Sequence, residues 1–196
     1  MKVKWILLLL TTVLLMLTII STSTSAYFSD GELSGTNGLA AAEQVTVTLL
    51  SDGFEVTPWK AKWDGNGATN WVRINSGHSG TYAAECKRNN NGNLTSDSLN
   101  ASTATMIKVS FWFKPTSLTA GNMLVQIYNG STYNTLYDIV NYPTYQNNTW
   151  AYFSVNITDS QYFKSNFRLR FNGTALTATG KLFDLDDVLI QRKSWP

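Results

Sequence analysis

MIKVSFWFK, residues 106–114, is the stretch of sequence that decides the fold class. Successive side chains of an extended strand point to opposite sides, so every second residue shares a face. One face would be wholly apolar and consist of Ile107, Val109, Phe111 and Phe113. The other would carry Lys108, Ser110, Trp112 and Lys114. Such a strand needs a second sheet over its apolar face, and we expect it to end at Pro115, which cannot donate to a ladder.

The same alternation recurs in residues 123–128, 150–157 and 167–171. Apolar residues would fill the inward positions: Met123, Val125, Ile127, Ala151, Phe153, Val155, Ile157, Phe167, Leu169 and Phe171. Segments rich in Gly, Asn, Ser and Thr separate these runs, and helical periodicity is nearly absent after residue 50. We therefore expect an all-β fold in which two antiparallel sheets pack as a sandwich.

Four apolar residues near the C-terminus predict an irregular last strand: Phe183, Leu185, Val188 and Ile190. Each half of this set has the two-residue spacing of a strand, but the spacing from Leu185 to Val188 is three. All four can face the core only if an extra residue is accommodated at Asp186 and Asp187, which is a β-bulge. The bulge would place two adjacent carboxylates at a sheet edge, where they need a positive partner.

The N-terminus has the parts of a secretory signal peptide. Residues 1–4 carry two lysines, residues 5–20 form an apolar run of sixteen, and residues 21–26 are small and mostly polar. The run is shorter than the ~20 residues of a membrane-spanning helix. We expect a signal helix over residues 1–26, cleaved near Ser25 or Ala26. The alternative is an uncleaved N-terminal membrane anchor, which would also leave the rest of the chain outside the cell.

The rest of the chain predicts an arm over residues 27–50 and one domain over residues 51–196, since no low-complexity linker divides the latter. Lys2 and Lys4 are two of the 15 basic residues, so the mature chain has 13 residues of each sign. A nearly neutral chain with scattered basic residues argues against a nucleic-acid partner.

The scarcity of Cys and His excludes several kinds of site. Cys86 is the only cysteine and shares a strand face with Tyr82 and Ala84, which favours a buried, inert thiol over a reactive or intermolecular one. His78 is the only histidine, which argues against a zinc site and a Ser-His-Asp triad. No other nucleophile is paired with a base, so we expect no catalytic residues.

Several segments, taken in order, resemble the MAM-type and carbohydrate-binding jelly-roll domains. They are Asp52-Gly53-Phe54-Glu55, Ser79-Gly80-Thr81-Tyr82-Ala83, Leu99, residues 107–113, Trp150 and Leu185-Asp186-Asp187-Val188. The resemblance covers roughly residues 51–192 and implies a jelly-roll β-sandwich.

The resemblance also implies a structural calcium ion that joins the first and last strands. Glu55 and Asp186 would be its carboxylate ligands, and Asp187 is a further candidate. Backbone oxygens near Asp52 and from the Ser79 to Thr81 turn would complete the oxygen shell. The chemistry fits, because calcium takes six to eight oxygen ligands and offsets repulsion between clustered carboxylates. The alternative is that Asp186 and Asp187 pair with lysines or face water.

The outward residues of the predicted strands form a mixed aromatic and polar face that suits a glycan. The candidate ligand-binding residues are Trp112, Tyr128, Trp150, Tyr152, Arg168 and Arg170, with Lys108 and Gln126 among them. Sugar rings present apolar C–H faces edged by hydroxyls, which aromatic rings beside Arg and Gln complement. The alternative is that loops cover Trp112 and Trp150. We expect three further tryptophans to fill the core: Trp59, Trp63 and Trp71.

Residues 26–41, AYFSDGELSGTNGLAA, resemble the start of mature TasA, camelysin and related archaeal surface-fibre subunits. The matching positions are Ala26-Tyr27-Phe28-Ser29-Asp30, Glu32, Ser34, Asn37 and Ala41, and beyond residue 42 the chain departs from these families. The resemblance implies polymerisation by an N-terminal strand inserted into the next subunit, with Val45, Val47 and Leu49 as donor-strand residues. The alternative is that this segment folds back onto its own domain as a first strand.

We therefore expect a secreted, non-catalytic, calcium-stabilised jelly roll that binds carbohydrate or mediates adhesion outside the cell or at its surface. The alternative is a structural subunit of an extracellular filament whose partners are copies of itself. Six Asn-X-Ser/Thr sequons permit surface glycosylation: Asn93, Asn100, Asn129, Asn147, Asn156 and Asn172.

Overall fold

The computed structural model describes residues 42–63 and 70–196. The expected signal peptide and the segment that resembles fibre subunits lie outside the described residues. Within the described residues, no helix is long and apolar enough to cross a membrane.

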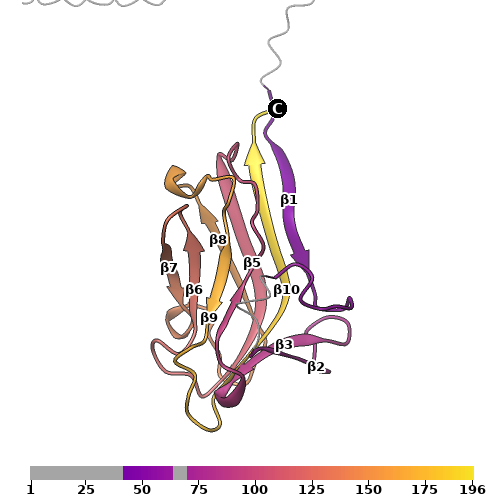
Figure 1. The fold of residues 1–196 in the computed structure, drawn as a ribbon, viewed down its shortest axis with the longest axis vertical. Helices are drawn as coiled ribbons and strands as arrows, with labels where there is room; N and C mark the ends of the chain where they lie inside the picture. Colours follow the sequence, from indigo (N-terminus) through magenta and orange to yellow (C-terminus); the bar gives the residue numbers. More distant parts are fainter. Residues whose placement is uncertain (1–41, 64–69) are drawn as a thin grey trace, which may run out of the picture. The chain divides into compact units, whose positions relative to one another are not determined.

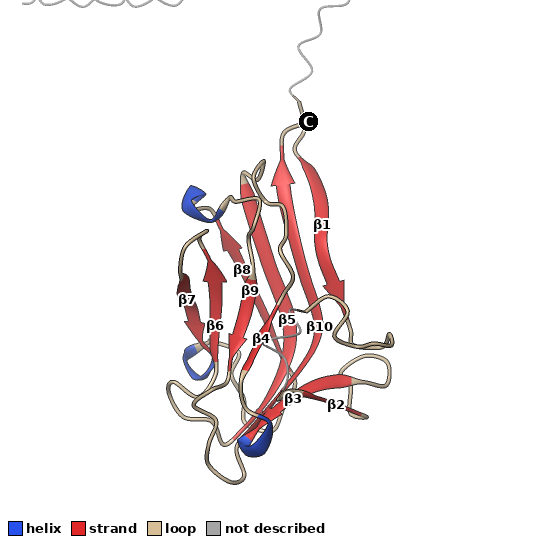
Figure 2. Ribbon diagram, viewed as in Figure 1, coloured by secondary structure: helices blue, strands red, loops and turns tan. Residues whose placement is uncertain are grey.

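Two antiparallel sheets form a sandwich, which confirms the all-β prediction (Figure 1 and Figure 2). The strands of the larger sheet are β1 (Val45–Asp52), β2 (Val72–Ile74), β3 (Ala83–Lys87), β5 (Met106–Thr116), β8 (Ala151–Ile157) and β10 (Leu182–Ser194). Those of the smaller sheet are β4 (Asn93–Thr95), β6 (Leu124–Tyr128), β7 (Tyr133–Asp138) and β9 (Leu169–Asn172). Three short 3₁₀ turns complete the described elements: η2 (Arg88–Asn90), η3 (Ile139–Asn141) and η4 (Ser160–Tyr162).

The six-stranded sheet has the order β2-β3-β10-β5-β8, and β1 also pairs with β10. The four-stranded sheet has the order β4-β9-β6-β7. From β3 to β10, the chain crosses from one sheet to the other at every connection except that between β6 and β7. This alternation decides which outward side chains share a face.

Strand β10 carries the predicted bulge. Its register with β5 shifts between Asp186 and Leu189, and Asp187 has a φ of +50°. The four apolar residues around the bulge are all buried: Phe183, Leu185, Val188 and Ile190. The prediction that the bulge lies at a sheet edge is wrong, because β10 is an inner strand. The bulge lies where β10 exchanges one neighbour, β3, for another, β1 (Figure 1).

Aromatic rings from both sheets meet in the core. Phe111 of β5 stacks on Phe153 of β8 with 4.4 Å between ring centroids, and it meets Phe171 of β9 edge to face at 4.9 Å. Every predicted inward residue is buried except Val155, which is half-buried. Trp63 and Trp71 are buried, and Trp59 is half-buried against the ring of Phe54.

Two predictions, one about the end of a strand and one about a donor strand, differ from the structure. Strand β5 does not stop before Pro115 but continues to Thr116, and Pro115 is in register with Phe183 of β10. The candidate donor-strand residues lie in β1, which pairs along its length with β10 of the same chain. The alternative is therefore correct for residues 45–52, which form an ordinary strand of their own domain.

Cys86 is fully buried on β3 beside Gly173. Burial raises the pKa of its thiol to about 12, and only the thiolate is nucleophilic. The prediction that this thiol is buried is confirmed.

Candidate functional site

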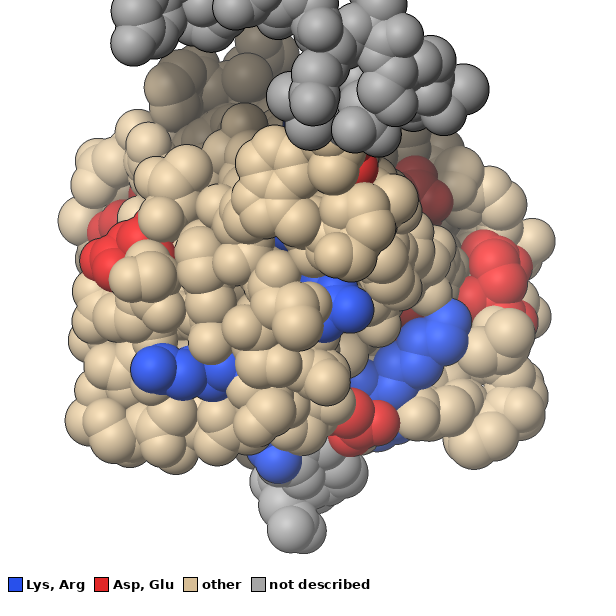
Figure 3. Space-filling model, turned by 90° about the horizontal axis from the view of Figure 1, so that it is seen from above, with Lys and Arg blue, Asp and Glu red and all other residues tan. Residues whose placement is uncertain are grey.

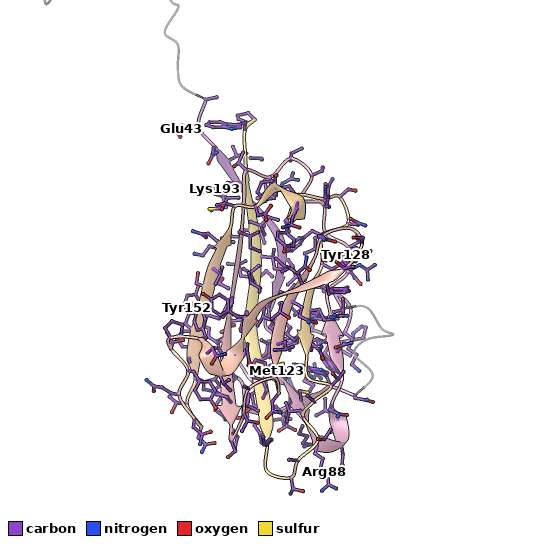
Figure 4. The ribbon with its side chains drawn as sticks, turned by 90° about the vertical axis from the view of Figure 1, so that its left-hand side faces the viewer. Glu43, Arg88, Met123, Tyr128, Tyr152 and Lys193 are labelled. Atoms are coloured by element: carbon purple, nitrogen blue, oxygen red, sulfur yellow. The ribbon has the colours of Figure 1, made fainter. Side chains whose placement is uncertain are left out.

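The candidate glycan-binding residues lie on two opposite faces of the sandwich. The six-stranded sheet and its flanks carry Trp112, Trp150 and Tyr152. The four-stranded sheet and its flanks carry Tyr128, Arg168 and Arg170. Figure 4 shows Tyr152 and Tyr128 on opposite sides of the domain, with Met123 between them. The prediction of one shared face is therefore wrong, because β5 and β8 belong to one sheet and β6 and β9 to the other.

Hydrogen bonds and a cation–π contact connect side chains on neighbouring strands of the four-stranded sheet. Arg170 on β9 is in register with Gln126 on β6, and its Nε donates to the Gln126 Oε1 at 2.8 Å. The Arg170 guanidinium also lies over the ring of Tyr133 on β7, 3.6 Å from its centroid. Gln126 in turn donates to Thr135 Oγ1 at 3.2 Å. Burial lowers the pKa of Arg170 from its ordinary value, yet an arginine remains charged at neutral pH.

An open hollow of about 270 Å³ lies beside this network, lined by Tyr128, Tyr133, Asn166 and Arg168. The two tyrosine rings are 5.0 Å apart between centroids and tilted by 43°. Both rings are half-buried, and Asn166 is exposed. The outer surface of the four-stranded sheet, formed by these four residues with Gln126, Thr135 and Arg170, is called the Tyr128 face below.

Three aromatic residues on the opposite side are packed together under a loop. His78 stacks on Trp112 at 3.8 Å between centroids and meets Trp150 edge to face at 5.6 Å. Trp112 also contacts Tyr152, with centroids 5.3 Å apart. Trp112 and Trp150 are half-buried, while Tyr152 is 39% exposed. A loop thus covers part of Trp112, as the alternative expected, and Tyr152 stays open to a ligand.

Charged residues form a ladder beside these rings. Lys114 on β5 pairs with Asp184 on β10 at 3.3 Å, and Lys87 pairs with Glu85 on β3. Asp184 is almost fully buried, and this burial raises the pKa of its carboxyl to about 6 although Lys114 opposes the change. Lys114 also lies over the Trp150 ring.

The structure brings four of the five candidate metal ligands to one loop at the bulge: Asp186, Asp187, Ser79 and Glu55. Asp186 is fully buried and accepts the backbone N–H groups of His78, Ser79 and Asp187. Asp187 accepts the Ser79 hydroxyl and pairs with His78 Nδ1 at 2.9 Å. Glu55 reaches the same loop and accepts two of its N–H groups, at residues 81 and 82. Asp187 therefore pairs with a histidine rather than with a lysine.

Asp52 does not join this group with its side chain. One carboxylate oxygen accepts the Trp63 indole N–H at 2.7 Å, and the other accepts the backbone N–H of Phe54. Asp52 is 5% exposed, so its carboxylate is committed to holding Trp63 in the core.

The residues at the bulge fit a calcium ion in their chemistry. Gly53 has no side chain, and a Cβ there would lie 3.5 Å from one Asp187 oxygen and 3.6 Å from one Asp186 oxygen. Two carboxylate oxygens therefore face the same small space, and burial foremost raises the pKa of Asp186 to about 6. No three Asp, Glu, His or Cys side chains in the described part of the chain form a metal-binding group alone. A calcium ion here would also need backbone or water oxygens.

Three residues of the two faces were missed from the sequence. Tyr133 lies opposite Tyr128 across the hairpin that joins β6 to β7, and the Asn129-Gly130 pair in its turn is a signal that would have identified it. Asn166 and His78 lie on loops, and no periodic pattern places a loop residue against a particular strand.

Neither the sequence models of known protein families nor the sequences of curated proteins match the chain. Among solved structures, the chain is similar to the CBM22-1 xylan-binding domain of Paenibacillus barcinonensis Xyn10C. The identity is 15%, the TM-score is 0.45, and the match covers 79% of this chain and 99% of that domain. It is also similar to a family 16 carbohydrate-binding module, at 16% identity and a TM-score of 0.44, over 64% of this chain and 93% of the module.

A third similar structure is the CBM22-1–GH10 part of Clostridium thermocellum Xyn10B in complex with xylohexaose. The identity is 15%, the TM-score is 0.46, and the match covers 75% of this chain but 28% of that one. The ligands named for these proteins are properties of those proteins.

Proposed function

We propose that this domain is an exported, non-catalytic module that binds a neutral glycan on the Tyr128 face. The observation that carries the proposal is the open hollow in which Tyr128 and Tyr133 stand beside Arg168 and Asn166. Arginine and amide groups donate to and accept from sugar hydroxyls, while tyrosine rings cover the apolar C–H side of a sugar.

The network around Arg170 favours binding because it holds the site in one conformation. Gln126 fixes the Arg170 guanidinium, which in turn covers one side of the Tyr133 ring. A ligand that meets a fixed surface loses less side-chain entropy to ordering than one that must order the surface itself. The proposed role in glycan binding rests on this preorganised wall together with the open Tyr128 ring.

Replacing Tyr128 by alanine is expected to weaken glycan binding at least about tenfold, because a central aromatic contact dominates the affinity of such sites. The measurement is affinity electrophoresis against a panel of neutral polysaccharides, followed by calorimetry with the best ligand. Xylan belongs in the panel because one of the similar structures is a xylan-binding domain.

Tyr152→Ala is the matched control, since it also removes a tyrosine ring, but from the opposite face (Figure 4). It should leave neutral-glycan binding unchanged, and circular dichroism should show both variants folded. Loss of binding in Tyr152→Ala but not in Tyr128→Ala would move the site to the six-stranded sheet. Equal loss in both, or no binding by the native domain, would end the proposal.

We also propose that the domain binds a stabilising calcium ion at the bulge through Asp186, Asp187, Ser79 and Glu55. Calcium at about a hundredfold excess over its Kd stabilises a folded protein by about 2.7 kcal/mol. For a domain of this size we expect the melting temperature to rise by about 5–10 °C over its value in a chelator. Differential scanning calorimetry with and without millimolar calcium measures the shift.

Asp187→Asn tests the assignment while keeping the local hydrogen bonds. Its partners, the Ser79 hydroxyl and the His78 ring, can each donate or accept, so an amide is accommodated. The variant should lose more than half of the calcium-dependent shift. Asp97→Asn removes an exposed carboxylate elsewhere and should retain the whole shift. If a chelator does not change the melting temperature of the native domain, the domain binds no stabilising calcium and the proposal is wrong.

A further inference from the structure

The outer side of the six-stranded sheet carries rows of outward side chains that the Tyr128 face does not involve. One row crosses four strands in register: Thr48 on β1, Gln191 on β10, Lys108 on β5 and Asn156 on β8. The row beyond it consists of Thr46, Lys193 and Met106. Adjacent strands are about 4.8 Å apart, so the four-residue row spans about 14 Å.

All residues of these two rows except Thr48 line a hollow of about 380 Å³, together with Ser154 and Arg192. The lining includes the side chains of Lys108 and Lys193, with Gln191, Asn156 and Ser154, and no Asp or Glu among the described residues. Lys108 is half-buried and Lys193 is exposed, and neither takes part in a salt bridge within the described part of the chain. Elsewhere on this sheet the lysines are paired, as Lys114 is with Asp184.

The row between this hollow and the aromatic group consists of three serines and one leucine: Ser51, Leu189, Ser110 and Ser154. Ser110 follows Lys108 as the next outward residue of β5 and is in register with Ser154 of β8. The next row on these strands is Trp112 with Tyr152. Alternate residues of a strand are about 6.7 Å apart, so Lys108 lies about 13 Å from the aromatic row. That length accommodates two or three sugar units of a chain.

Charge complementarity decides what could occupy this surface. Two unpaired lysines with two amides complement a carboxylate, and an open tyrosine at the other end complements a sugar ring. The basic residues are confined to a small area, and acidic and basic side chains are interspersed over the end of the domain seen in Figure 3. A duplex nucleic acid needs a continuous basic surface, which these two lysines do not provide.

We infer that the outer side of the six-stranded sheet is a second saccharide site, specific for an acidic polysaccharide of the uronate class. Lys108 and Lys193 bind a carboxylate of the polymer, Asn156 and Gln191 bind its hydroxyls, and Tyr152 stacks on a neighbouring sugar ring. This site is separate from the Tyr128 face, so either can fail without the other.

The test uses the whole mature chain and polygalacturonate as the probe, with the fully methyl-esterified polymer as its uncharged counterpart. Lys108→Gln/Lys193→Gln should weaken polygalacturonate binding by at least about tenfold, since a charge-assisted hydrogen bond is among the stronger polar contacts. Tyr152→Ala should weaken it as well, whereas Tyr128→Ala should not. The esterified polymer should bind weakly, and salt should lower the affinity for the charged one.

Lys164→Gln is the matched control, because it removes an exposed lysine beside the Tyr128 face. Equal weakening by this control would show general attraction between charges and overturn the proposal, as would unaltered binding by the double variant. Equal binding of the esterified polymer would overturn the acidic specificity. Full competition by millimolar inorganic phosphate, with no contribution from Tyr152, would reveal a small-anion site in place of a saccharide site.

Discussion

Phe111→Ala should reduce the free energy of unfolding by about 3–5 kcal/mol, the largest loss expected from any single truncation in this domain. Phe111 is fully buried and stacks on Phe153 at 4.4 Å, and it meets Phe171 of the opposite sheet at 4.9 Å. Its ring therefore joins the two layers of the sandwich. Domains have total stabilities of about 5–15 kcal/mol, so this change removes a large part. Urea unfolding, followed by tryptophan fluorescence, measures it.

Tyr152→Ala provides the comparison, since Tyr152 belongs to β8 and is 39% exposed. It should cost less than about 1 kcal/mol, as surface truncations usually do. Phe111→Leu keeps an apolar side chain and provides a milder step if the alanine variant does not fold. A cost below about 1.5 kcal/mol for Phe111→Ala would contradict the view that this ring joins the layers.

The alternation of apolar and polar residues predicted the strands well, because it follows directly from which side of each strand is buried. Residues 106–114 alternate as one buried and one outward face, and the broken spacing around Asp186 predicted a bulge that is present. Each of these features depends on a few consecutive residues. Such local patterns are readable without knowing which strands are neighbours.

The composition of each face could not be predicted in this way. Trp112 and Tyr128 both point outward from strands only a few residues apart in sequence, yet they lie on opposite sides of the domain. Their separation follows from the alternation of strands between sheets, which depends on long-range pairing. The edge position predicted for Asp186 failed for the same reason, because the partners of β10 come from distant parts of the chain.

The loop that carries His78 connects the proposed metal site to the aromatic group. Asp186 and Asp187 hold residues 78 and 79 by four hydrogen bonds, and the same histidine stacks on Trp112. A cation at the bulge would therefore stabilise the loop that covers part of Trp112. Tryptophan fluorescence would then report on calcium binding.

Gly173→Ala should destabilise the domain by about 1–3 kcal/mol through overpacking. A Cβ at position 173 would lie closer than 3.0 Å to both the Cys86 sulfur and the terminal methyl carbon of Met123. Both neighbours are fully buried, so the space cannot open toward solvent. Met123 can change its rotamer because its side chain is flexible, but the short Cys86 side chain cannot move far.

Combining Gly173→Ala with Cys86→Ala should therefore recover much of the loss, because the second change removes the sulfur that blocks the new methyl group. We expect the double variant to be close in stability to Cys86→Ala alone, which corresponds to a coupling energy of about 1–2 kcal/mol in a double-mutant cycle from urea unfolding. Gly180→Ala is the control: a Cβ there meets nothing within 4 Å, and its cost arises only from the φ of +80°. Cys86→Ala should not rescue that variant, and strictly additive losses at 173 and 86 would show that the sulfur is not what the methyl group meets.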